Sequence, residues 1–254
     1  MLKSEVISFA MNQGADLIGF ASSERFRDAP RAHHPEDFIS QAGTVISFGM
    51  LIPKPVLNYE TLLKESELIP PELREEYLQK YFYHACGYSI INRLLDFLGY
   101  KLTRYLEKRG FAAIYFTPTY GKEYEHFQES IPDHKGIFSH RHAAVRSGLG
   151  EFGLNNVVVT PEYGPRVRFN SVITDAEIEQ DPLLQKKACL GFGCRACMIK
   201  CGTGAIQYIS AEKDIDDGQV WIDPVTTTEV DTCRNGRIEA FCLGRCLAVC
   251  PVGC

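Results

Sequence analysis

Long apolar runs are missing from this chain of 254 residues. No stretch approaches the roughly 18 apolar residues that a membrane-spanning helix requires. The N-terminal stretch MLKSEVISFAMNQGAD is amphipathic, and it lacks both the apolar segment and the small-residue cleavage site of a secretory signal. These absences predict a cytoplasmic globular protein that makes no contact with a membrane.

Basic residues are outnumbered by acidic ones. The chain holds 27 Lys and Arg against 32 Asp and Glu, for a formal net charge of -5, so its overall charge does not favour nucleic acid. The C-terminal region from residue 189 also lacks the basic surface that a tRNA partner would favour. We therefore do not expect a nucleic-acid partner. A G-x-G-x-x-G fingerprint is missing as well, which argues against a Rossmann dinucleotide site.

Cysteine is scarce in the first 188 residues, where Cys86 stands alone, and abundant after them. The other nine cysteines all lie between residues 189 and 254. Clustered cysteines in an intracellular chain more often bind metal than form disulfides. The change in composition predicts two domains, an α/β cofactor- or substrate-binding domain at 1–180 and a cysteine-rich domain at 181–254.

The apolar periodicity of residues 1–180 indicates mixed helices and strands in layers, an α+β arrangement. We expect helices near 2–10, 34–43, 70–110 and 136–150, and strands near 16–21, 44–51 and 111–118. On the long helix one face should carry Ile91, Leu94, Leu98, Leu102 and Tyr105. The turn residues PEYG, at 161–164, predict a hairpin between the flanking apolar segments.

The cysteine spacing is close to that of bacterial ferredoxins. Cys194-x2-Cys197-x3-Cys201 matches most of the run C-x2-C-x2-C-x3-C-P, and a second run ends in Cys250-Pro251. In ferredoxins with two clusters the last cysteine of each run binds the opposite cluster. This rule predicts two [4Fe–4S] clusters. The first would take Cys189, Cys194, Cys197 and Cys250, and the second would take Cys201, Cys233, Cys242 and Cys246.

Two other uses of these cysteines stay open at this point. Four-thiolate zinc sites usually carry paired C-x2-4-C knuckles, and only Cys194 and Cys197 form a good one. A disulfide-linked surface is the third alternative. Cys86 and Cys254 are left over, and we expect Cys86 to be a small buried hydrophobic side chain.

The segment RHAAVRSGLGEFGLNNVVVTPEYGPRVRFNSVITD, at 141–175, followed by the two cysteine runs, resembles the epoxyqueuosine reductases and, more distantly, the reductive dehalogenases. The resemblance implies a corrinoid-binding α/β domain followed by a ferredoxin-like domain with two [4Fe–4S] clusters. It places six residues near the corrinoid (cobalamin) pocket: Arg141, Arg146, Gly148, Gly150, Asn155 and Asn156. The D-x-H-x-x-G motif is missing, so a corrinoid would be held without a protein histidine on cobalt.

The same resemblance implies a proton donor just before this segment. An ungapped count puts His134, with Asp133 beside it, where the family carries its acid aspartate. The implied function is a reductase that receives electrons from a ferredoxin- or flavodoxin-type donor and reduces a small organic substrate. The alternative is a non-catalytic electron carrier or corrinoid-handling protein, and a flavin in the N-terminal domain also stays open.

Overall fold

The computed structural model describes residues 2–58, 61–62, 69–119, 136–233 and 244–253. Contacts divide the chain into two compact units. The first unit is Met1–Met50, Asn92–Leu149 and Arg168–Gln185, and the second is Leu51–Ile91, Gly150–Val167 and Lys186–Cys254. The cysteine-rich segment thus shares a unit with two segments from before residue 180. These units are defined by contacts and are not continuous in the sequence. The domain boundary expected near residue 180 stays a prediction.

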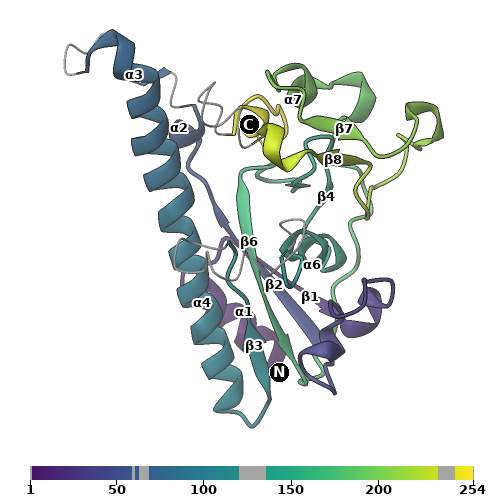
Figure 1. Ribbon diagram of the computed structural model, residues 1–254. Coiled ribbons are helices and arrows are strands. Elements are labelled where there is room, and N and C mark those ends of the chain that lie inside the picture. Colours follow the sequence, from purple (N-terminus) through teal and green to yellow (C-terminus); the bar gives the residue numbers. More distant parts are fainter. Residues whose placement is uncertain (1, 59–60, 63–68, 120–135, 234–243, 254) are drawn as a thin grey trace. The chain divides into compact units, whose positions relative to one another are not determined.

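The first unit is built on a sheet with the strand order β1-β2-β6-β3 (Figure 1). Its strands are β1 (Leu17–Ser22), β2 (Thr44–Leu51), β3 (Ala113–Tyr115) and β6 (Val167–Thr174). Strand β1 pairs antiparallel with β2, and β3 pairs antiparallel with β6. The two long strands β2 and β6 are buried over almost their whole length, as expected for the middle of a sheet covered on both faces.

Helices cover both faces of this sheet, and the alternation of side chains along the strands shows it. On β6, the Asn170 side chain donates a hydrogen bond to the Leu95 carbonyl of α4 (Ile90–Glu107). The next residue, Ser171, contacts His140 of α6 (His140–Arg146) on the opposite face. Helix α1 (Leu2–Asn12) lies beside α4, where Phe9 stacks on Tyr105. The prediction of a mixed α/β fold is therefore confirmed.

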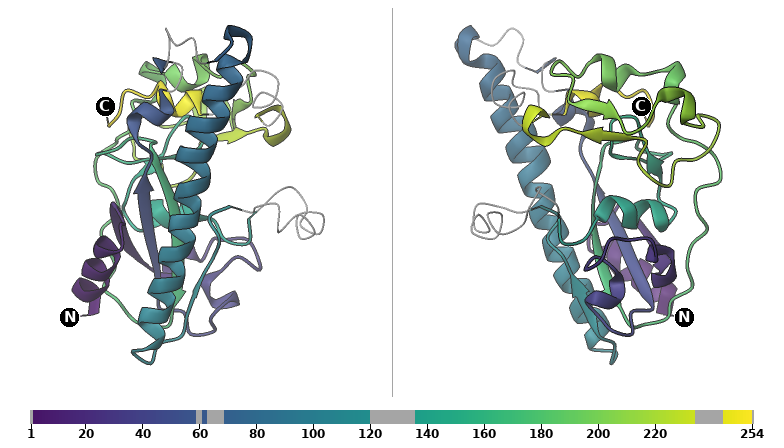
Figure 2. Two further views of the ribbon diagram at one scale, coloured as in Figure 1. Left: turned by 90° about the vertical axis from the view of Figure 1, so that its left-hand side faces the viewer. Right: turned by 45° about the vertical axis from the view of Figure 1, so that its right-hand side comes forward.

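Helix α4 continues an uninterrupted helical run that begins with α3 (Pro71–Leu78) and passes through the π-helix η4 (Gln79–Ser89) (Figures 1 and 2). The buried apolar side chains of α4 are Ile91, Leu95, Leu98, Leu102 and Leu106. We predicted Leu94 on this face, but it is 47% exposed. Residues 94 and 95 are both leucine, so the apolar pattern alone does not show which of the two side chains is buried.

Three further expectations differ from the structure. The helix expected at 34–43 is reduced to a short 3-10 helix, η2 (Pro35–Asp37). The PEYG turn forms, closed by an isolated bridge between Thr160 and Gly164. Its flanking segments do not pair as a hairpin, because β5 (Val158–Val159) pairs with β4 (Glu151–Phe152) while β6 joins the large sheet. Cys86 is exposed and not buried.

The second unit includes α3 and η4 of this helical run, and its other elements are short. Besides β4 and β5 it holds α2 (Lys54–Leu57), the 3-10 helices η7 (Gly191–Gly193) and η8 (Glu212–Asp214), and α7 (Ala196–Ile199). The antiparallel pair β7 (Ile206–Tyr208) and β8 (Thr226–Thr228) and the helix α9 (Arg245–Ala248) complete it. Within the described residues, no helix has the length and apolar character of a membrane span.

Replacing Leu102 by Ala should lower the free energy of unfolding by about 2–5 kcal/mol, because its fully buried side chain would leave a cavity in the core of the first unit. Leu94→Ala, on the exposed side of the same helix, is the matched control and should change it by less than about 1 kcal/mol. Urea unfolding followed by circular dichroism compares the two. Equal losses would contradict the assigned buried face.

Candidate functional site

Four cysteines from the two separate runs line one pocket in the second unit. They are Cys189, Cys194, Cys197 and Cys250. Leu154, Asn155 and Val159 contribute to the wall of the same pocket. These four sulfurs are the set that the spacing rule assigned to the first cluster, and the structure brings them together. That they bind iron stays a prediction.

The two cysteine runs are locally alike. Helix α7 follows Arg195, whose φ is 50°, and α9 follows Gly244, whose φ is 79°. Both residues are left-handed, so the chain turns sharply before each helix. Each helix carries a cysteine at its second position, Cys197 or Cys246, and the cysteine four residues later is Cys201 or Cys250. Helices α7 and α9 contact each other.

Cys250 is held in place by close backbone packing against the PEYG turn. A Cβ atom on Gly164 would lie 2.0 Å from the Val252 carbonyl oxygen, so only glycine fits there. The Arg166 guanidinium donates a hydrogen bond of 2.7 Å to the Gly253 carbonyl. The turn predicted from the sequence therefore serves to dock the segment that follows Cys250.

The thiols of this pocket affect one another. Burial raises the pKa of Cys197 to about 12, with further contributions from the neighbouring Cys189 and Cys250. Burial also raises the pKa of Cys189. None of the eight cysteines that the structure describes forms a disulfide. Among the described residues, no three His, Cys, Asp or Glu side chains are grouped closely enough for a single metal ion.

Three of the four cysteines assigned to the second cluster lie in the described residues. Burial would raise the pKa of Cys201, but hydrogen bonds outweigh it and lower this pKa; they come from the Thr203 hydroxyl and from the backbone of residues 203, 205 and 206. Cys233 lies in a helical segment that includes residues 230–233, and its N–H donates to the Glu229 carbonyl. Cys242 lies outside the described residues. Donor groups aimed at a sulfur, as at Cys201, stabilise a thiolate.

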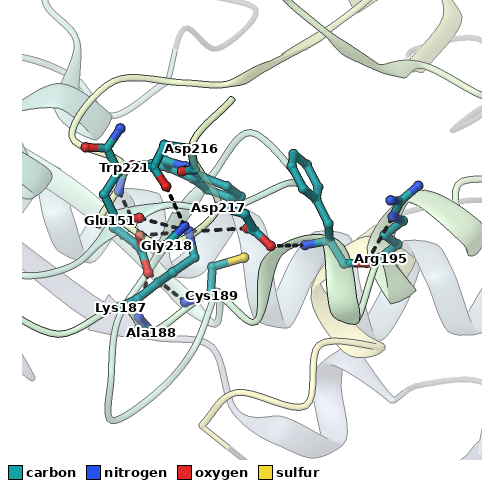
Figure 3. A network of polar contacts seen from close by, with 11 residues as sticks. Glu151, Lys187, Ala188, Cys189, Arg195, Asp216, Asp217, Gly218 and Trp221 are labelled. Carbon is teal, nitrogen blue, oxygen red and sulfur yellow. Dashed lines mark hydrogen bonds and ion pairs between the residues drawn. The ribbon is translucent and has the colours of Figure 1, made fainter. Parts of the chain in front are cut away.

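A buried carboxylate that we did not predict as functional supports this pocket (Figure 3). Glu151 begins β4, and its side chain is fully buried. Its Oε1 accepts hydrogen bonds from the backbone N–H groups of Ala188, at 2.5 Å, and Cys189, at 2.7 Å. Its Oε2 accepts one from the Trp221 N–H at 2.9 Å. The signal in the sequence was a single acid within the otherwise apolar and glycine-rich stretch GLGEFGLNN.

A second acid, Asp217, contacts the loop between Cys189 and Cys194. Its Oδ2 accepts a hydrogen bond of 2.9 Å from the Phe192 N–H. Its Oδ1 lies 3.6 Å from the Lys187 Nζ, and that Nζ lies 3.9 Å from Oε2 of Glu151. Lys187 also sits over the Trp221 ring, 3.2 Å from its centroid. The sequence showed Asp217 only as part of the loop EKDIDDGQ.

The residues that the resemblance placed near a corrinoid are divided between the two units. Arg141, Arg146 and Gly148 belong to the first unit, and Gly150, Asn155 and Asn156 belong to the second. Arg146 forms a two-pronged ion pair with Asp28. A Cβ atom on Gly148 would lie 2.1 Å from the Pro182 carbonyl oxygen, so chain packing alone requires this glycine.

The three residues of the second unit also have partners within the protein. A Cβ atom on Gly150 would lie 2.5 Å from the Val159 carbonyl oxygen. Asn155 lines the cysteine pocket, and its side-chain amide lies 3.5 Å from the Cys246 carbonyl. Asn156 has a φ of 56° and donates to the Thr228 hydroxyl. These contacts order the protein itself, and the placement of the six residues around a corrinoid stays a prediction.

His140, the first residue of α6, joins three segments of the first unit. Its Nδ1 lies 3.0 Å from the Ser171 hydroxyl, and its Nε2 lies 3.2 Å from the Thr117 carbonyl. Burial lowers the pKa of His140 to about 4, although the Thr117 carbonyl opposes this shift. The ring is therefore neutral near pH 7, with Nε2 donating and Nδ1 accepting. Asp133 and His134, the predicted proton donors, lie outside the described residues.

No protein-family model matches the chain. It is 25% identical over 225 residues to an epoxyqueuosine reductase from Bacillus cereus, an alignment that covers 81% of this chain and 52% of the relative. It is 36% identical over 117 residues to a tetrachloroethene reductive dehalogenase from Dehalobacter restrictus, which covers 42% of this chain and 21% of the relative. The chain thus spans about half the length of the epoxyqueuosine reductase that it matches.

Solved structures share the fold. An epoxyqueuosine reductase from Streptococcus thermophilus superposes with a TM-score of 0.59 at 18% identity, covering 99% of this chain and 66% of the other. A reductive dehalogenase, whose structure is described as suggesting a mechanism for B12-dependent dehalogenation, gives 0.61 at 16% identity, covering 98% and 31%. A third, an epoxyqueuosine reductase with a modified tRNA stem loop, gives 0.50 at 20%, covering 80% and 52%.

Gly191→Ala should disrupt the loop between Cys189 and Cys194. The new Cβ would lie 1.8 Å from Oδ1 of Asp217, and the φ of 57° costs about 1–2 kcal/mol without glycine. We expect the iron bound after anaerobic reconstitution to fall by about half, as one of two clusters is lost. Gly193→Ala is the control, because nothing lies within 4 Å of its added Cβ. Equal iron contents would contradict the placement of this loop.

The pKa of His140 predicts a loss of stability in acid. The unfolded imidazole binds a proton below its ordinary value of 6.5, whereas the folded one stays neutral until about pH 4. The stability contributed by neutral His140 is therefore lost as the pH falls from 6.5 towards 4. His140→Gln keeps a donor and an acceptor, and its unfolding midpoint should depend less on pH in this window. His33→Gln, on the surface of the same unit, should retain the wild-type dependence.

Proposed function

This chain is a homologue of the epoxyqueuosine reductases and the reductive dehalogenases, as its motifs indicated, and from that premise we propose that it is an iron–sulfur reductase. It would take electrons from a ferredoxin- or flavodoxin-type protein and pass them to an acceptor that reduces an organic substrate. The observation that carries the proposal is the single pocket lined by Cys189, Cys194, Cys197 and Cys250. Two bound [4Fe–4S] clusters would supply low-potential, one-electron transfer.

The four pocket cysteines fit a [4Fe–4S] cluster in the chemistry of their donor set. Such a cluster requires four thiolates directed at one volume, and these four come from two runs, as the exchange of last cysteines requires. Gly191, beside Cys189, lets the backbone turn with a φ of 57°. Iron would bind by displacing the protons that burial and the neighbouring sulfurs favour on Cys189 and Cys197.

We assign the second cluster to Cys201, Cys233, Cys242 and Cys246. Support comes from the local likeness of α7 and α9, since Cys246 holds the position in α9 that Cys197 holds in α7. The N–H groups around Cys201 favour its thiolate form. With both assignments, residues 181–254 would form a ferredoxin-like domain with two clusters.

A corrinoid is the acceptor that we propose, on homology alone. A reductive dehalogenase that shares this fold is described as B12-dependent. The residues we had expected around it, such as Arg146 and Gly148, are engaged in protein contacts, so no binding geometry supports the assignment. Asp133 or His134 would supply the proton, in line with the position of the family's acid.

The proposed substrate is an organic molecule, either free or attached to a larger molecule. The matched relatives include a tetrachloroethene reductive dehalogenase and an epoxyqueuosine reductase seen with a tRNA stem loop. The second of these runs against our expectation that nucleic acid is not a partner. A substrate attached to tRNA therefore stands beside a free small molecule in the proposal.

A non-catalytic electron carrier, or a protein that handles corrinoids for a partner enzyme, is the second candidate. The observation that favours it is the engagement of Arg146, Gly148 and Gly150 in contacts within the protein. A carrier needs the two clusters but no acceptor site of its own.

Anaerobic reconstitution with iron and sulfide tests the cluster assignment. The wild-type chain should bind about eight irons and show the broad iron–sulfur absorption, and Cys197→Ser should bind about half as many. Cys86→Ser changes an exposed cysteine outside both sets and is the control. A colourless protein, or one that takes up zinc in preference to iron, would overturn the proposed function.

Cobalamin uptake separates the reductase from the carrier. The reconstituted protein is mixed with cobalamin without oxygen, desalted, and analysed for cobalt and iron together. About one cobalt per chain, retained beside the full iron content, supports the reductase. Full iron content with no retained cobalt supports the carrier. Apo-protein, without iron, shows whether any uptake depends on the clusters.

A further inference from the structure

We infer that Glu151 is a positioning residue, which fixes Cys189 for the first cluster and lowers the reduction potential of that cluster. The inference rests on the proposed function, because it needs a cluster on Cys189. Neither the iron–sulfur motif nor the family resemblance singled out this residue. Its placement became visible only in the folded second unit (Figure 3).

Backbone donors surround the Glu151 carboxylate. The side chain is fully buried, and three backbone N–H groups point at its two oxygens. Two of these donors, Ala188 and Cys189, belong to the chain that delivers the first sulfur. Hydrogen bonds from N–H to a carboxylate are roughly twice as strong as those between neutral groups. Glu151 therefore holds the backbone of Cys189 more firmly than a neutral side chain would.

The charge of Glu151 has a nearby counter-charge. A buried carboxylate is costly unless hydrogen bonds and a cation compensate it. Lys187 is that cation, with its Nζ 3.9 Å from Oε2 of Glu151. The Nζ also donates to the Gln219 carbonyl and lies over the Trp221 ring. The lysine is thus held between Glu151 and Asp217, beside the sulfur pocket.

The loop from Cys189 to Cys194 is held by two acids, one at its first residue and one at Phe192 within it. Glu151 accepts the Cys189 N–H, and Asp217 accepts the Phe192 N–H. These anchors provide a physical reason for the x4 spacing, which is longer than the x2 of the bacterial run. An intervening stretch of four residues must be ordered by contacts other than the cluster itself.

The electrostatic consequence has a definite sign. Reduction adds negative charge to the cluster, so a buried anion nearby disfavours the reduced state and lowers the potential. Removal of the Glu151 charge should raise the potential. Removal of the Lys187 charge should lower it. A residue that served only to stabilise the fold would not produce these opposite shifts.

Glu151→Gln is the main test, with Glu162→Gln, an exposed acid of the same unit, as its control. The glutamine amide would face N–H donors in place of one acceptor oxygen. After anaerobic reconstitution we expect less iron in Glu151→Gln and, for the cluster that remains on Cys189, a potential above that of the wild type. Iron analysis and a redox titration followed by electron paramagnetic resonance provide both readouts. The signal lost in Cys197→Ser identifies the first cluster.

Lys187→Met is the second variant, because it keeps an apolar stem on Trp221 and leaves every backbone contact of Glu151 in place. It should bind iron as the wild type does and show a lower potential. If Glu151→Gln fails to fold, this shift decides: a lower potential supports the inference and an unchanged one overturns it. If Glu151→Gln folds with wild-type iron content and potential, the inference about Glu151 is wrong and the proposed function is unaffected. A wild-type chain that binds no iron overturns the proposed function as well.

Discussion

The pocket of the second unit depends on one constraint: sulfur atoms far apart in the sequence must be held close together without a disulfide. Burial and the neighbouring sulfurs disfavour ionisation of these cysteines, so the chain has to supply the order from its backbone. It does so with acids that accept N–H groups, the buried Glu151 and the half-buried Asp217, and with glycine contacts that admit no side chain at Gly164 and Gly191. Backbone contacts of this kind place Cβ atoms firmly, and the sulfurs follow.

The same constraint explains why the glycine-rich segment lies beside the cysteine pocket. The stretch from Gly148 to Asn156 leaves the first unit, forms β4 and lines the cysteine pocket with Asn155. We had assigned its glycines and asparagines to a cofactor. In the structure they allow close packing and left-handed turns, which are the ordinary physical reasons for glycine and asparagine at such positions.

The first unit is held together by a covered sheet and by the hydrogen bonds of His140. Its sheet is covered on both faces, and His140 links α6 to β6 and to the segment after β3 through hydrogen bonds that require a neutral ring. The similarity to solved reductases and dehalogenases is a similarity of fold.

The sequence by itself determined the features that depend on local spacing. Cysteine intervals set by turns and short helices predicted which four sulfurs would meet, and apolar periodicity predicted most strands and the long helix. Only the tertiary structure decided the features that depend on distant partners. The choice of Leu95 over Leu94 comes from the sheet that the helix covers, and the separation of β5 from β6 comes from the partner strand that each one finds. The role of Glu151 needed the fold most, because a buried acid is recognised by the donors that surround it, and those lie 37 to 70 residues away along the chain.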